Sequence, residues 1–394
     1  MQGYPVLAHN RIPIQSWDRA PWNRWTFQHV REILPTTSVC GQPLTPWKLP
    51  QRPVDISSVP FQGQNEHKTH SLTVNQWLET SYTDGFIVLH RGDVVFERYM
   101  NDMTTQSPHL SQSMSKSITA SVASILIQRG LLDVEKQITD YLPELEDTAW
   151  KGATLQHVLD MTTGVKYVED YEALDSDIAT TDIACGWKPA PAQYVGPSCI
   201  WDQILSLAHT TRPHGQLFEY RSIETDVLAH CMERVTQTRL ATLVSTELWQ
   251  PLGCEHPANF TVDSAGYALA CGGFSASLRD FARFGLMYLQ RGFGNGKQIL
   301  PIAWIDELQS AEASLFNDPY TRGTPKGAYH NHFWVEDVDR SAYMARGVFG
   351  QFIYVDPDND LVCVKLSTWP EFTSVPRLHT TLNAFHAIGQ YLNC

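Results

Sequence analysis

The sequence predicts a mixed α/β protein (α+β), in which an antiparallel sheet is flanked by helices and joined to an all-helical subdomain. Two apolar runs, 86–90 and 94–99, surround a Gly-containing turn and predict a β-hairpin. Two more, 352–355 and 361–366, surround a second polar turn. Helical patterns fill the stretch between them. We therefore expect a sheet built from strands at both ends of the chain, with a helical insertion.

Each expected helix has its own apolar periodicity. After Ser113, apolar residues recur at i, i+4, i+7 and i+8 from Ile118, and Gly130 ends the pattern. A second amphipathic pattern covers 277–291 and stops at Gly292. The other helical patterns lie at 155–161, 201–209 and 225–235.

These elements suggest three regions. Residues 1–80 are rich in Pro and Trp, lack periodicity, and are expected to form an irregular segment packed on the body. Residues 81–110 and 250–394 supply the sheet domain, and 111–249 form a mainly helical subdomain. We expect the active site between the last two.

Composition narrows the class of protein. Of 394 residues, 43% are hydrophobic and 18% are charged, which is typical of a globular chain. A net charge of −13 repels polyanions, so we expect no nucleic-acid partner. No apolar run approaches the roughly 20 residues that cross a bilayer, and residues 1–11 do not read as a secretory signal. We expect no membrane association.

The eight cysteines are scattered and form no C-x-x-C pair. A zinc knuckle or redox motif is therefore not indicated, and we expect neither a metal nor an organic cofactor. Free thiols buried in a reducing compartment are the default interpretation, which favours the cytoplasm.

The segment Ser113-Met114-Ser115-Lys116 carries the chemistry. A serine three residues before a lysine, at the start of a helix, places both side chains on one face. The amine can take the hydroxyl proton if burial lowers its pKa, and the helix N-terminus favours a developing oxyanion. About one chance match to S-x-x-K is expected in a chain of this length. The alternative is an N-cap serine beside a surface lysine.

Tyr220-Arg221-Ser222 supports the catalytic interpretation. It lies in a loop between helical patterns, where a site residue is plausible, although a packed core tyrosine is the alternative. The same Y-x-S/N pattern also occurs at 99–101, 329–331 and 391–393.

In this order, the two motifs resemble the serine β-lactamase-like superfamily of class C β-lactamases, DD-peptidases and esterases. The stretches 154–164 and 272–285 are also similar to that superfamily. The resemblance covers roughly residues 80–394 and implies the β-lactamase/transpeptidase-like fold. It also implies a nucleophile at Ser113, proton transfer by Lys116 and Tyr220, and an orienting role for Ser222.

Within the superfamily, the sequence is most similar to the 6-aminohexanoate-dimer (nylon oligomer) hydrolases. Residues 23–27, 169–171, 350–351 and 367–370 carry this resemblance. It implies that Tyr171 contacts the scissile amide and that Asp182 contacts the free amino end of the substrate. The alternatives are a rim aromatic and a solvated loop carboxylate.

The sequence also departs from the pattern. Where β-lactamases carry Lys-Thr-Gly, the matching stretch is assigned to Phe349-Gly350-Gln351, without a lysine that would hold a β-lactam carboxylate. This alignment makes Phe349 and Gln351 substrate-binding residues and makes the N–H of Phe352 the partner of the Ser113 N–H in the oxyanion hole. Cys271 stands where the nylon hydrolases have a polar amide residue, in the substrate site.

The expected function is therefore a serine hydrolase that cleaves a small amide or ester through an acyl-enzyme on Ser113, with a homodimer and a monomer as the open alternatives for its assembly. The alternatives on the same scaffold are β-lactamase, DD-peptidase and acyltransferase activity. A non-catalytic binding protein is the alternative of another class. A Ser-His-Asp hydrolase is disfavoured because the chain contains no G-x-S-x-G.

Overall fold

The computed structural model describes residues 3–42, 44–65 and 68–394. A seven-stranded sheet, antiparallel throughout, forms its centre, and both predicted hairpins belong to it. Strands from the two ends of the chain meet where β15 pairs with β4. In spatial order the strands are β11 (Ala328–His330), β12 (Phe333–Val335), β13 (Tyr343–Gly347), β14 (Gln351–Asp356), β15 (Leu361–Ser367), β4 (Thr83–His90) and β5 (Asp93–Tyr99).

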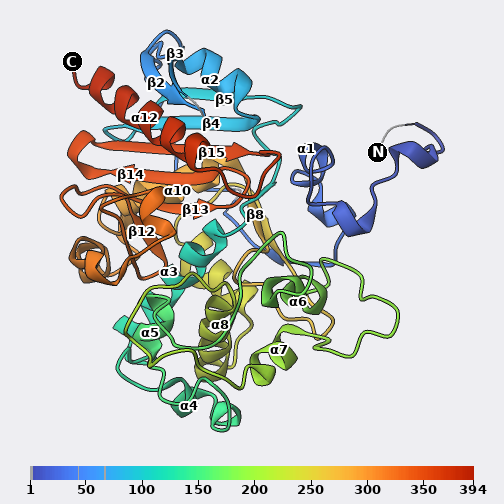
Figure 1. The fold of residues 1–394 in the computed structure, drawn as a ribbon. Helices are drawn as coiled ribbons and strands as arrows, with labels where there is room; N and C mark the ends of the chain where they lie inside the picture. Colours follow the sequence, from blue (N-terminus) through green and yellow to red (C-terminus); the bar gives the residue numbers. More distant parts are fainter. Residues whose placement is uncertain (1–2, 43, 66–67) are drawn as a thin grey trace.

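Helices α10 (Leu278–Leu289) and α12 (Val375–Leu392) cover opposite faces of this sheet (Figure 1). Gly285 lets α10 approach closely, since a Cβ there would lie 2.6 Å from Val362 Cγ1. On the other face, the Phe385 ring of α12 packs against Phe86 and Tyr354. Alternate residues of each strand therefore face different helices, and both faces are apolar.

Helices α3 to α8 gather beside one end of the sheet, below it in Figure 1. Almost all of α3 is buried, which its helical periodicity anticipated. A second sheet, antiparallel and ordered β1-β7-β8-β6, leads into α3 through β6. The helices are α3 (Met114–Gln128), α4 (Ile138–Tyr141), α5 (Leu155–Leu159), α6 (Asp177–Ala184), α7 (Ile200–Ser206), α8 (Ile223–Thr236) and α9 (Leu240–Leu243), and the strands are β1 (Thr36–Val39), β7 (Ala258–Thr261), β8 (Phe274–Ala276) and β6 (His109–Leu110).

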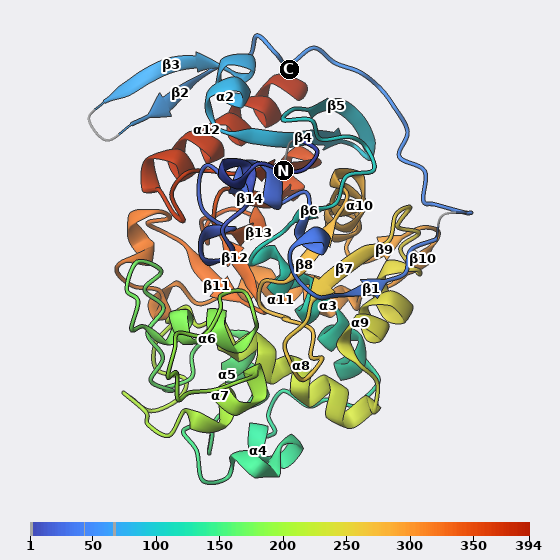
Figure 2. The same ribbon diagram turned by 90° about the vertical axis from the view of Figure 1, so that its right-hand side faces the viewer.

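The first 80 residues are more regular than predicted. They contain β1, the hairpin of β2 (Pro60–Gln64) and β3 (Thr69–Thr73), and the helix α2 (Val74–Thr80). Thr73 begins α2 through a capping box with Gln76, a signal that the sequence contained. Figure 2 shows this hairpin extending past α12.

The expectation that the chain closes with strands is wrong, because α12 follows β15. Its start also carries local signals, since the Ser374 side chain accepts from Arg377 N and Pro376 stands in the first turn. No helix within the described residues has the length and apolarity that a membrane crossing requires.

Candidate active site

Ser113 lies where the chain turns from β6 into α3, at the junction of the sheet and the helical region. Its backbone is helical, and its side chain makes no capping hydrogen bond to α3. Ser113 thus holds the N-cap position without capping the helix, and its hydroxyl is left for other partners. Ser113 is half-buried and lines the cavity between the two regions.

Lys116, one turn further along α3, is completely buried beneath Ser113. Its Nζ donates to Ser113 Oγ at 3.0 Å, to Ser222 Oγ at 3.0 Å and to the Cys271 carbonyl at 2.7 Å. The Tyr220 ring centroid is 5.0 Å from Nζ. The structure thus brings together the four residues predicted from the two motifs.

Glu169 is the polar partner that sequence reasoning missed. Its carboxylate accepts from Ser222 N at 2.5 Å, from Ser222 Oγ at 2.6 Å and from the Tyr171 hydroxyl. Ser222 is therefore fixed between Glu169 and Lys116. The only signal was its place in the stretch 169–171, which carried the family resemblance but indicated no role.

The direction of the Lys116 pKa shift differs from the prediction. Burial by itself lowers the pKa of Lys116, but Tyr220, Cys271 and Glu169 outweigh it, so the pKa is raised. Burial raises the pKa of Tyr220, against the opposing influence of Lys116. Lys116 and Tyr220 therefore titrate as a coupled pair, and burial alone does not set the direction of the Lys116 pKa as the sequence-based prediction assumed.

The backbone beside Ser113 comes from the end of β13. A Cβ on Gly347 would lie 3.0 Å from Ser113 N and 2.6 Å from Ser111 O, so only glycine permits this approach. Val348 follows at the tip of the β13–β14 hairpin, where Phe349 and Gly350 both have positive φ. Gly347, which precedes this left-handed tip, is therefore the residue whose backbone lies against that of Ser113.

Phe352 and Gln351 consequently lie away from their predicted positions. The Phe352 backbone is paired with Arg346 on one side and Lys365 on the other, inside the sheet, so it does not complete an oxyanion hole. Its ring lines the cavity. Gln351 is fully buried and donates to the Ser367 carbonyl at 2.6 Å while accepting from Ser367 N at 3.1 Å. It fastens the hairpin to β15 instead of facing substrate.

Two compartments open on either side of Ser113. Ser113, Tyr171, Val348 and Phe372 border both. The narrow compartment has a volume of about 50 Å³, and the wide compartment about 370 Å³. The narrow one is also lined by Gln112, Asp182, Trp187, Cys271 and Phe349, and the wide one by Tyr220, Trp334, Arg346, Phe352 and Trp369.

The narrow compartment is acidic at one end. Asp182, on α6, lines it together with Asp18, which the sequence did not single out. Burial, followed by the charge of Asp18, raises the pKa of Asp182 to about 7. Asp18 is ion-paired with Lys188, whereas Asp182 forms no ion pair within the described residues. This end of the compartment suits a cationic group.

Tyr171 stands at the boundary between the compartments. Its ring stacks on Phe372 at 4.9 Å, and its hydroxyl donates to Glu169. Tyr171, Asp182, Cys271 and Phe349 all lie around Ser113, as the resemblance implied, although contact with substrate stays a prediction.

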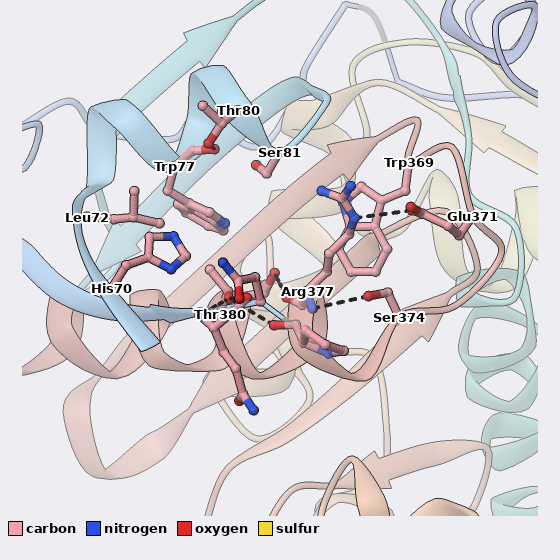
Figure 3. A pocket seen from close by; sticks show the side chains of 14 residues that line it. His70, Leu72, Trp77, Thr80, Ser81, Trp369, Glu371, Ser374, Arg377 and Thr380 are labelled. Atoms are coloured by element: carbon pink, nitrogen blue, oxygen red, sulfur yellow. Dashed lines mark hydrogen bonds and ion pairs between the residues drawn. The ribbon is translucent and has the colours of Figure 1, made fainter. Parts of the chain in front are cut away.

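A separate hollow of about 340 Å³ lies behind Trp369, between α2, the β2–β3 hairpin and α12 (Figure 3). Trp77 and His70 line one side, and Arg377, paired with Glu371, lines the other. Trp369 borders both this hollow and the wide compartment, so it forms the wall between them.

A half-exposed serine bonded to a buried lysine, with a tyrosine against that lysine, is the arrangement of a serine hydrolase that uses no histidine base. Comparison with known proteins agrees. The Beta-lactamase family model matches residues 80–387, and the chain belongs to that family.

Individual relatives show which members of the family this chain is similar to. The 6-aminohexanoate-dimer hydrolase of Paenarthrobacter ureafaciens is 33% identical over 371 residues, covering 93% of this chain and 91% of its own length. A solved structure provisionally described as a 6-aminohexanoate-dimer hydrolase from Bacillus anthracis has a TM-score of 0.89 at 28% identity, covering 98% and 99% of the two chains. EstCE1, a hydrolase with promiscuous acyltransferase activity, shares the fold (TM-score 0.61, 16% identity, 80% and 96% covered).

Proposed function

We propose that the protein cleaves small linear amides or esters through an acyl-enzyme on Ser113, as expected for a relative of the 6-aminohexanoate-dimer hydrolases. The contact of Lys116 Nζ with Ser113 Oγ, at 3.0 Å within the Ser222–Tyr220 network, is the observation that supports this most strongly. A serine so placed, at the mouth of two compartments, can attack a carbonyl bound between them.

Lys116 and Tyr220 act as one coupled acid–base pair. Because both pKa values are raised, the pair must lose one proton before it can accept the proton of Ser113. That proton is then returned to the leaving amine or alcohol, and water cleaves the acyl-enzyme with the same pair as base. Ser222 and Glu169 position Lys116 through the hydrogen bonds already described.

The oxyanion is stabilised by backbone N–H groups. Ser113 N lies at the start of α3, and the close approach of Gly347 places the next peptide, that of Val348, beside it. This pair replaces the one predicted with Phe352.

The narrow compartment holds the acyl half of the substrate. Its small volume suits a slender, unbranched chain rather than a fused ring. Asp182 pairs with an ammonium at the far end of that chain, and Tyr171 contacts the scissile amide. Tyr220 borders only the wide compartment, so the group to which it gives a proton leaves on that side.

A panel of substrates tests the function. We expect turnover of the linear 6-aminohexanoate dimer and of 4-nitrophenyl butyrate, with negligible turnover of nitrocefin. Rapid nitrocefin hydrolysis would instead indicate a β-lactamase. Release of 4-nitrophenol that depends on an added alcohol and forms its ester would indicate an acyltransferase.

A further inference from the structure

Arg346 is half-buried and differs from the fully buried arginines Arg221 and Arg283 in its partners. Arg221 pairs with Glu219 at 2.5 Å and Arg283 with Asp280 at 2.6 Å. In the part of the chain that the structure describes, no carboxylate is ion-paired with Arg346. Its guanidinium instead lies 4.7 Å from the centroid of the Trp334 ring. A half-buried cation without a counter-ion pays part of its desolvation cost, and an anionic ligand can offset that cost.

The position of Arg346 connects it to the reaction. It belongs to β13, immediately before the Gly347 that touches Ser113, and it lines the wide compartment. Trp334 also stacks on Tyr220, with centroids 5.4 Å apart. Arg346 and the proton donor to the leaving group therefore lie against the same aromatic side chain, in the same compartment.

The other arginine that lines the wide compartment already has a carboxylate partner. Arg322 also lines the wide compartment, but it is exposed and forms two hydrogen bonds to the Asp318 carboxylate, at 2.7 and 2.8 Å. Glu169, the acidic residue on the same wall, is occupied by Ser222 and Tyr171. Arg346 is thus the group with donors available for an anion.

We propose that Arg346 binds a carboxylate carried by the leaving group, so that the preferred substrates are amides or esters of amino or hydroxy acids. This inference rests on the proposed function and specifies the half of the substrate on the Tyr220 side. Together with Asp182, it makes the two compartments opposite in charge, which orients a zwitterionic chain across Ser113 in one direction only. A planar guanidinium donates two parallel hydrogen bonds to such a carboxylate.

The kinetic test uses two substrates that differ in one group: the linear 6-aminohexanoate dimer and the same dimer with its carboxylate converted to a carboxamide. We expect the protein to prefer the carboxylate in kcat/KM by about 10-fold or more, as charge-assisted hydrogen bonds typically contribute. Arg346→Met should reduce the ratio to about 2 or less, and Arg346→Lys should restore part of it. Arg322→Met, the matched control, should keep the ratio.

A ratio near 1 for the unchanged protein, or a ratio that survives in Arg346→Met, would overturn the proposal while leaving the hydrolase intact. If neither dimer is cleaved, a binding experiment distinguishes failure of the carboxylate site from failure of the proposed hydrolase function. In the Ser113→Ala variant, calorimetric titration should show hexanoate binding at least about 10-fold more tightly than hexanamide, and the additional change Arg346→Met should abolish the difference. Equal affinities would overturn the carboxylate site whatever the reaction.

Discussion

Two buried lysines of this protein each donate to a serine hydroxyl, yet only one pair has the surroundings of an active site. Lys116 contacts Ser113 at the start of a helix, and Lys365 contacts Ser367 at the end of β15. Both lysines are completely enclosed. Ser113 reaches two compartments, whereas Ser367 is fully buried. A lysine–serine contact is therefore insufficient, because the hydroxyl must also meet a substrate.

The pKa values of the two lysines are also shifted in opposite directions. Tyr220, Cys271 and Glu169 raise the pKa of Lys116 against the influence of burial. Burial lowers the pKa of Lys365 to about 7, since its nearest ring neighbours are Trp77 and Trp369 and its carboxylate neighbour, Asp84, compensates only in part. The acidic groups around Lys116, more than its depth, thus set the direction of its pKa shift.

Removing the hydroxyls should produce the largest contrast. Ser113→Ala should lower kcat/KM for 4-nitrophenyl butyrate by about 10⁴-fold or more, as for other serine nucleophiles. Ser367→Ala should change it by less than about threefold, because that hydroxyl reaches no substrate. Steady-state kinetics on the two variants measure this contrast. Equal losses of kcat/KM would contradict the distinction between the two lysine–serine pairs.

Replacing the lysines tests the proton-transfer role. Lys116→Met should cost about 10³-fold in kcat/KM, within the usual range for a general acid–base group. Lys365→Met should retain nearly full activity. The wild-type pH profile provides a second measurement: because the pKa values of Lys116 and Tyr220 are raised, kcat/KM should still be rising above pH 8. A profile that is flat from pH 6 to 9 would contradict the coupled pair.

The glycine beside Ser113 should be more sensitive than the glycine on the far side of the hairpin tip. Gly347→Ala should reduce kcat by about 10²-fold, since a Cβ there displaces the oxyanion peptides. Gly350 is the matched control, because Gly350→Ala strains a positive φ against Trp369 and should lower the melting temperature more than kcat. If Gly347→Ala kept full kcat, another donor would have to bind the oxyanion.

The smallest expected effect is on the pH dependence of the free energy of unfolding, through Lys365. The folded pKa of Lys365, about 7, lies below its unfolded value, so the unfolded chain binds more protons between the two. Stability should therefore rise as pH increases from 7 towards 10 and be lower below 7. Urea unfolding of the wild type and Lys365→Met should show this slope only in the wild type. Parallel slopes would mean that Lys365 titrates normally.

The predictable part of the site was local. Ser113 and Lys116 are three residues apart on one helix, so their spacing alone placed them on one face. Tyr220 depended on resemblance, because a loop position carries no periodicity. Glu169 lies 53 residues from Ser222 in sequence, and only the tertiary fold reveals that it bonds Ser222.

The incorrect predictions about individual site residues also have physical causes. The oxyanion peptide was misassigned to Phe352 because the left-handed backbone at Phe349 and Gly350 cannot be read from an alignment of short motifs. Gln351 was assigned to substrate by the alignment with Lys-Thr-Gly, whereas its buried amide bonds the backbone of Ser367. The pKa of Lys116 depends on three neighbours contributed by distant segments.

The most direct measurement is the site of acylation. The protein is mixed with 4-nitrophenyl butyrate, quenched in acid within milliseconds, digested and mapped by mass spectrometry. We predict a butyryl group on the peptide that contains Ser113, formed at the rate of the 4-nitrophenol burst and absent from Ser113→Ala. A burst that persists in Ser113→Ala, or an adduct on Ser367 or any other residue, would contradict the account.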